Sequence, residues 1–82
     1  MARNKDAYRG WVLKRGDNDK YVSSIISNGN PSEPVVYYTD DIQEARAFLR
    51  FGAAEARAEQ LGLLIAWFST DDNGKRIEKG LV

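Results

Sequence analysis

The apolar segment at residues 63–70 constrains the fold more than any other part of this 82-residue chain. Its sequence, Leu-Leu-Ile-Ala-Trp-Phe-Ser-Thr, predicts a β-strand. A strand with one face in water alternates apolar with polar residues, and this one does not. Its two faces carry Leu63, Ile65 and Trp67 on one side and Leu64, Ala66 and Phe68 on the other. The sheet that contains this strand therefore needs cover on both faces.

Four other segments also predict strands, namely residues 8–15, 20–27, 35–39 and 76–82. The first two are joined by Gly16-Asp17-Asn18-Asp19, a turn in which Gly and Asn accept positive φ, and together they predict a hairpin. The turn Asp71-Asp72-Asn73-Gly74 contains Asn-Gly, a strong hairpin signal. Residues 28–34 are rich in Pro and Asn and predict a loop, and the polar residues 1–7 predict a flexible start.

A short helical turn is expected at residues 42–45, because the preceding Asp40 and Asp41 are good N-cap residues. The next stretch, residues 46–51, is compatible with a helix or with an extended link. We favour a link that ends at Gly52, since a glycine inside a helix costs about 1 kcal/mol.

The main helix is predicted at residues 53–61, where Ala54, Ala58 and Leu61 form one apolar stripe. Gly62 suits the left-handed position that follows a helix. The order is therefore βββ, short helical turn, α, ββ. It predicts a single α+β domain over residues 1–82, with an antiparallel sheet of four to five strands and one main helix packed on one face.

One short helix covers one face of such a sheet only in part, so the second face needs another explanation. The link at residues 42–51, which carries Ile42, Phe48, Leu49 and Phe51, could fold across it. The sheet could instead curl over itself, or the face could meet a partner that is identical or different. The sequence leaves these three alternatives open.

The residue types exclude most catalytic chemistry. The chain has no cysteine and no histidine, which removes thiolate and imidazole nucleophiles and bases and the usual zinc ligands. Three carboxylate pairs occur in predicted turns, where backbone capping is favoured over metal binding: Asp17/Asp19, Asp40/Asp41 and Asp71/Asp72. We expect no enzyme, no cofactor and no metal site.

The charge is balanced, with twelve Lys and Arg against twelve Asp and Glu. The first hairpin is nevertheless locally basic and contains aromatic residues, an arrangement that can hold single-stranded nucleic acid. The basic residues of that alternative are Arg9, Lys14, Arg15 and Lys20. The zero net charge speaks against it, because nucleic-acid-binding domains are normally basic. The sequence shows neither a secretion signal nor an apolar run long enough for a membrane helix, so a cytoplasmic location is expected.

Residues 37–48, with Thr-Asp-Asp-Ile followed by Ala and Phe, and the Ala- and Glu-rich stretch 54–62 ending in Leu-Gly, resemble small orphan proteins of phages and prophages. In size, neutrality and lack of catalytic groups the chain is similar to anti-CRISPR and related anti-defence proteins. The resemblance implies a non-enzymatic inhibitor in the host cytoplasm that binds a host defence complex by steric occlusion.

Sheet-borne aromatic residues and one acidic turn are the candidate partner-binding residues: Trp11, Tyr21, Tyr37, Tyr38, Trp67, Asp71 and Asp72. Two other functions remain as alternatives. One is single-strand nucleic-acid binding through the first hairpin, and the other is a homo-oligomeric sponge for a nucleotide signal. A homodimer would also account for the strand that is apolar on both faces.

Overall fold

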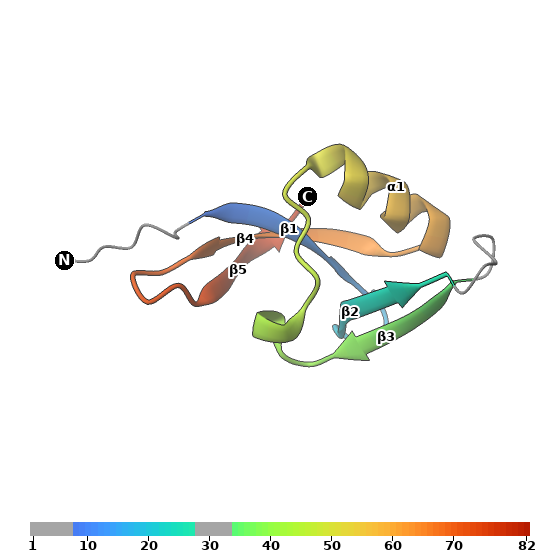
Figure 1. Cartoon of the computed structure of the whole chain (residues 1–82), viewed down its shortest axis with the longest axis horizontal. Coiled ribbons are helices and arrows are strands. Elements are labelled where there is room, and N and C mark those ends of the chain that lie inside the picture. The colour runs from blue at the N-terminus through green and yellow to red at the C-terminus, as the bar shows by residue number, and fades with distance from the viewer. Residues whose placement is uncertain (1–7, 28–33) are drawn as a thin grey trace.

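The computed structural model, which describes residues 8–27 and 34–82, has the α+β fold expected from the sequence (Figure 1). Its five strands form one antiparallel sheet in the order β3-β2-β1-β4-β5. The elements are β1 (Arg9–Lys14), β2 (Tyr21–Ile26), β3 (Val35–Thr39), the 3-10 helix η1 (Ile42–Glu44), α1 (Phe51–Leu61), β4 (Leu64–Thr70) and β5 (Arg76–Leu81). The predictions for residues 1–7 and for the loop at 28–33 lie outside the described residues.

The turns form through Asp and Asn side chains that bond nearby backbone groups. In the β1–β2 turn, Asn18 Oδ1 accepts a hydrogen bond from the Lys20 N–H at 3.0 Å. The positive φ of this turn is at Asp19, at 59°, so the expectation that Gly16 or Asn18 would supply it was wrong. In the β4–β5 turn Gly74 has a φ of 81°, as the Asn-Gly signal predicts.

Helix α1 begins earlier than the sequence suggested. It starts at Phe51, so the predicted break at Gly52 was wrong. Gly52 lies in the first, exposed turn, where the backbone N–H groups have no intrahelical partner and the penalty for a mid-helix glycine does not apply. The end of the helix is as predicted, because Gly62 is left-handed at φ 68° and the Leu63 N–H donates to the Ala58 carbonyl at 2.9 Å.

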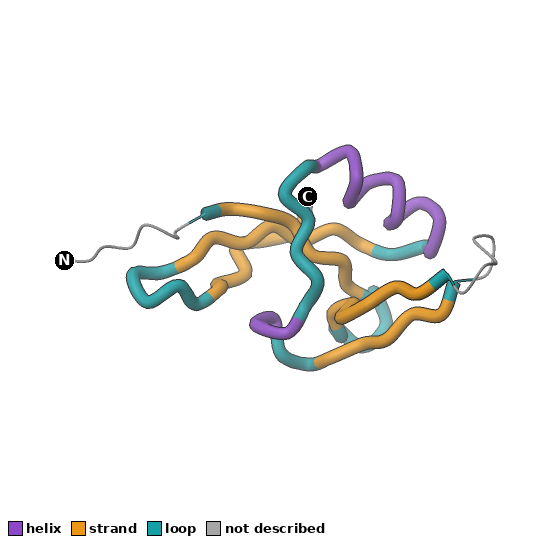
Figure 2. The backbone as a smooth tube through the Cα atoms, viewed as in Figure 1, coloured by secondary structure: helices purple, strands orange, loops and turns teal. Residues whose placement is uncertain are grey.

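The link between η1 and α1 is extended and forms part of the sheet. β1 pairs with β2 at Lys14 and Tyr21, and the link then lies between the two strands. Phe48 exchanges backbone hydrogen bonds with Trp11 at 2.8 and 2.9 Å, while the Arg46 N–H donates to the Val22 carbonyl at 2.9 Å. Figure 2 shows this loop crossing β1 on its way from η1 to α1.

Because the link is extended, its side chains alternate between two apolar layers on opposite sides of β1 and β4. The layer under α1 contains Leu13, Val22, Phe48, Ala54 and Ala58. The layer on the other side contains Val12, Ala45, Ala66 and Phe68, with Ile42 and Ala47 packed against it. The small Ala54 and Ala58 side chains let α1 approach the sheet closely, and both are buried.

The second face is covered by η1 and the start of the link, through Ile42, Ala45 and Ala47. The first of the three alternatives is therefore correct only in part, because Phe48 and Phe51 lie on the helix side and Leu49 is exposed. Arg76 of β5 secures this cover, since its guanidinium donates to the carbonyls of Ile42 and Ala45 and lies over the ring of Phe68. The amide of Gln43 also exchanges hydrogen bonds with the Arg76 backbone at 2.8 and 3.0 Å. None of the helices in the described residues is long and apolar enough to cross a membrane.

Candidate functional site

Two tryptophans lie opposite each other where β1 pairs with β4. Trp11 and Trp67 are register partners, and residues directly opposite in antiparallel strands point to the same face. That face is the one under α1, since Trp11 packs on the helix-side layer and its ring meets the edge of Phe51 with centroids 5.6 Å apart. Both indoles are only partly buried. The pair therefore sits beside the first residue of α1.

Helix α1 covers only one end of this face. From Phe51, next to Trp11, it extends to Leu61, which shares a hollow with Gly16 just beyond the end of β1. The other end of the face, toward the start of β1, carries exposed Arg9 and exposed Ile77. Figure 1 shows this end of β1, β4 and β5 extending away from the helix. The tryptophan pair marks the border between covered and uncovered sheet.

A hollow of about 340 Å³, here called the tryptophan hollow, lies at this border. It is lined by Arg9, Gly10, Trp11 and Trp67. Within the described part of the chain, the Arg9 guanidinium has no carboxylate partner and neither indole N–H has an acceptor. The polar side-chain groups of the hollow are thus hydrogen-bond donors, and its walls are apolar rings. This arrangement suits a flat or apolar group that carries negative charge.

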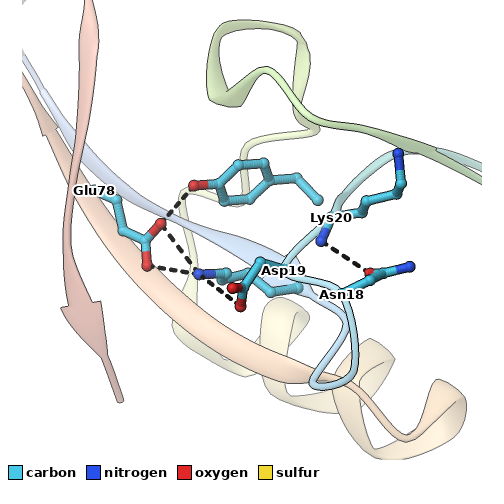
Figure 3. Close-up of polar contacts among 6 residues, drawn as sticks. Asn18, Asp19, Lys20 and Glu78 are labelled. Carbon is cyan, nitrogen blue, oxygen red and sulfur yellow. Dashed lines mark hydrogen bonds and ion pairs between the residues drawn. The ribbon is translucent and has the colours of Figure 1, made fainter.

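Tyr21 lies on the opposite face from the tryptophans. Its hydroxyl donates to Glu78 Oε1 on β5. Lys14 Nζ lies 3.0 Å from the other oxygen of that carboxylate, Glu78 Oε2. The same Nζ is also 3.8 Å from Asp19 Oδ1. Figure 3 shows Glu78 facing the β1–β2 turn that carries Asn18, Asp19 and Lys20. Tyr21 therefore joins the first hairpin to β5 and is not part of the tryptophan hollow.

The contacts of Tyr21 and Glu78 shift both of their pKa values. Burial of the phenol, the hydrogen bond to Glu78 and the negative charge of that carboxylate raise the pKa of Tyr21 to about 12. Burial alone would raise the pKa of Glu78, but the hydrogen bonds from Tyr21 and Lys14 and the lysine charge outweigh it. The pKa of Glu78 is consequently lower than the ordinary value for glutamate.

The two tyrosines of β3 point in opposite directions. Tyr38 packs against the helix-side layer, and the Arg15 guanidinium lies 5.2 Å from the centroid of its ring. Tyr37 is 52% exposed on the outer face of this edge strand. Neither tyrosine lines the tryptophan hollow.

Asp71 and Asp72 lie in the β4–β5 turn. The Asp71 carboxylate accepts hydrogen bonds from the backbone N–H groups of Asn73 and Lys75 at 2.8 and 2.9 Å, while Asp72 is exposed. Asp41 has a similar backbone role, because it caps η1 by accepting from the Gln43 N–H. No group of three or more acidic side chains that could hold a metal ion occurs within residues 8–27 and 34–82.

The four basic residues proposed for nucleic-acid binding differ in their surroundings. Three of them are ion-paired: Lys14 with Glu78, Arg15 with Asp17 and Lys20 with Asp40, at 3.0, 2.9 and 3.0 Å. Arg9 is the fourth, and it lies in the tryptophan hollow. The basic character of the hairpin is therefore mostly neutralised within the fold.

The structure brings Trp11, Trp67 and Arg9 together and distributes the other predicted residues over separate surfaces. Sequence reasoning had placed Arg9 with the basic hairpin, and it missed Gly10, which lines the hollow, and Phe51, whose ring packs against Trp11. The signal that could have found the hollow is the pairing register, because a β1–β4 ladder with Trp11 opposite Trp67 also places Arg9 opposite Ser69 on the same face.

A second hollow, of about 410 Å³, lies at the other end of α1. Its lining includes Arg15 and Asp17, which are bonded to each other by two hydrogen bonds of 3.0 and 2.9 Å. A ligand that used this arginine would have to displace its carboxylate. The tryptophan hollow is therefore the better candidate site.

Comparisons with protein-family models, with curated proteins and with solved structures found no match for this chain.

Proposed function

We propose that this chain is a non-enzymatic protein-binding module that docks an acidic segment of a larger protein in the hollow of Arg9, Trp11 and Trp67. The observation that carries the proposal is the position of Arg9, a cation with no carboxylate partner among the described residues, in a hollow that two register-paired tryptophans also line. Tryptophan and arginine are the residue types most often found at the energetic centres of protein interfaces. A carboxylate next to an apolar side chain would satisfy both the guanidinium and the rings.

A protein partner is favoured over a nucleic acid because of how the remaining charges are arranged. A polynucleotide needs a series of cations along its phosphates. Lys14, Arg15 and Lys20 are each engaged by a carboxylate, so the hairpin offers no such series within the described residues. One arginine beside two aromatic rings is enough to orient a single anionic group.

The finer proposal follows the resemblance to anti-CRISPR and related anti-defence proteins. The partner would be a host defence complex, and occupation of its surface would block the access of its own ligand. In this mechanism the bound chain acts by its bulk and is not consumed.

Binding can be measured by the intrinsic tryptophan fluorescence of the unaltered chain, because both of its tryptophans, Trp11 and Trp67, line the hollow. The probe is a synthetic peptide that alternates glutamate with leucine and phenylalanine, compared with the same peptide carrying lysine and with oligothymidylate. We expect the emission to shift with the acidic peptide. We also expect Arg9→Glu to weaken binding at least about tenfold.

Lys75→Glu is the matched control, because it makes the same change of charge at an exposed turn residue that does not line the hollow. Equal losses in both variants would mean general electrostatic attraction and would overturn the proposal. Tighter binding to oligothymidylate, with affinity that falls steeply as salt is added, would support the nucleic-acid alternative instead. Absence of a shift with all three probes would also contradict the proposed site.

A further inference from the structure

The outer edge of β3 lacks the charged residues and the proline that often protect a sheet edge. Strand β3 is the last strand on its side of the sheet, and its sequence, Val-Val-Tyr-Tyr-Thr, contains no charge and no proline. The backbone groups of β3 that point away from β2 have no partner among the described residues. The register of β3 with β2 shifts once, between Val22 and Ser24, and the extra residue lies on β2, so β3 itself has no bulge. Uncharged edges of this kind pair readily with another strand.

The exposed face of the same hairpin is apolar. Ile26 and Val35 are register partners, as are Ser24 and Tyr37, so the four side chains share one face. Ile26, Val35 and Tyr37 are 40%, 44% and 52% exposed. The partners on the other face, such as Ile25 and Val36, pack into the layer under α1. The uncovered apolar strip thus continues directly from the unpaired edge.

The opposite edge of the sheet differs in its charge and in having a bulge, although it also exposes the apolar residues Ile77 and Leu81. Strand β5 carries Arg76, Glu78 and Lys79 within six residues, and its register with β4 is interrupted near Trp67. Charges and bulges on an edge strand prevent pairing with other chains. A head-to-tail assembly of β3 with β5 is therefore disfavoured, and such an assembly would also fail to close.

We propose that β3 pairs antiparallel with β3 of a second copy of this chain, around a two-fold axis at Tyr37. In this register Tyr37 faces the partner's Tyr37, and Val35 faces the partner's Thr39. Strand β3 has no charged side chain that would repel its own copy. Asp40, which follows the strand, is held by Lys20 at 3.0 Å, so its negative charge is balanced within each subunit.

The proposed dimer interface does not overlap the tryptophan hollow. The hollow lies on β1 and β4, and β2 separates these strands from the β3 edge. The two proposals therefore stand or fall separately. Each dimer would present two copies of the hollow, so a partner with two acidic segments would bind through both.

Sedimentation analysis of the full chain tests the proposal. We expect a monomer–dimer equilibrium in which Tyr37→Lys raises the dissociation constant at least about tenfold, since each dimer then places two lysines opposite each other. Leu49→Lys is the matched control, because Leu49 is a 67% exposed apolar residue on the link, away from β3. Circular dichroism and the Tm establish that each variant is folded, and Val35→Lys serves as a second edge variant.

A cross-linking experiment tests the register. The chain has no cysteine, so Tyr37→Cys places a single thiol at the proposed two-fold axis. We expect this variant to form a covalent dimer on mild oxidation much faster than Leu49→Cys does. A chain that remains monomeric at every concentration, a dimer indifferent to Tyr37→Lys, or equal cross-linking of both cysteine variants would overturn the proposal.

Discussion

The ring of Phe68 occupies the space that a side chain at Gly10 would need. The two residues are register partners in β1 and β4, and a Cβ atom at Gly10 would lie 2.9 Å from Phe68 Cζ and 3.0 Å from the Phe48 carbonyl oxygen. Phe68 is fully buried, and the Phe48 backbone is bonded to β1, so neither neighbour has room to move. Gly10 is thus required by the packing of the layer beneath it.

Gly10→Ala should therefore destabilise the fold. Adding a methyl group to a closely packed layer typically costs about 1–3 kcal/mol, because side chains and backbone must shift. The measurement is the free energy of unfolding by denaturant. An alanine variant as stable as the parent chain would contradict the close approach.

Gly52→Ala is the matched glycine variant, and we expect the opposite sign. A Cβ atom at Gly52 would meet nothing within 4 Å, and the residue is helical. Alanine can adopt this backbone conformation, and it reduces the conformational entropy of the unfolded chain, so the variant should be more stable by about 0.4–1 kcal/mol. Together the two substitutions separate a packing requirement from a propensity effect.

Phe48→Ala tests the role of the link as an inserted strand. Phe48 is 6% exposed and packs between the sheet and α1, whereas the next residue, Leu49, is 67% exposed. Truncation of a buried phenylalanine costs about 3–5 kcal/mol, while an exposed position away from special features changes stability by less than about 0.5 kcal/mol. We expect that contrast between Phe48→Ala and Leu49→Ala in thermal unfolding. Similar losses in both variants would mean that Phe48 is not buried between the sheet and α1.

The element order was predictable because local signals are strong in this chain. The cap at Asp41, the left-handed Gly62 and the Asn-Gly turn before β5 each depend on a few neighbouring residues, and all three are present as predicted. The two apolar faces of β4 were also predictable from alternation, because Ile65 and Phe68 pack in opposite layers.

The route of the link and the composition of the hollow could not be predicted from local signals. The link pairs with β1 because β2 diverges from β1 after Tyr21, and that divergence is a property of the whole sheet. The grouping of Arg9 with the tryptophans depends on the β1–β4 register, which joins residues more than fifty positions apart. Tyr21 was likewise assigned to a binding surface, whereas its hydroxyl bonds Glu78. The identity of that acceptor also depends on long-range pairing.

The contact between Tyr21 and Glu78 makes stability depend on pH at both ends of the range. The pKa of Glu78 is lowered in the folded chain from an ordinary value of 4.5. As the pH falls below that value, the unfolded chain takes up a proton before the folded chain does, so stability decreases. The pKa of Tyr21 is raised from 10.0 to about 12. As the pH rises above 10.0, the unfolded chain loses its proton first, and stability decreases again.

Glu78→Gln should reduce both effects and lower stability at neutral pH by about 1–3 kcal/mol, because Lys14, whose side chain is 12% exposed, loses the nearer of its two carboxylate partners and keeps only exposed Asp19. Glu55→Gln is the matched control, since Glu55 is exposed on α1.

Ultraviolet titration of the tyrosines provides the second readout. The pKa of Tyr21 should fall in Glu78→Gln, where the carboxylate contributions disappear, and should stay above 10.0, since burial of the phenol is the largest cause of the shift. An unchanged tyrosine titration in Glu78→Gln, or an equal loss of stability in Glu55→Gln, would show that β5 is not joined to the first hairpin through this contact.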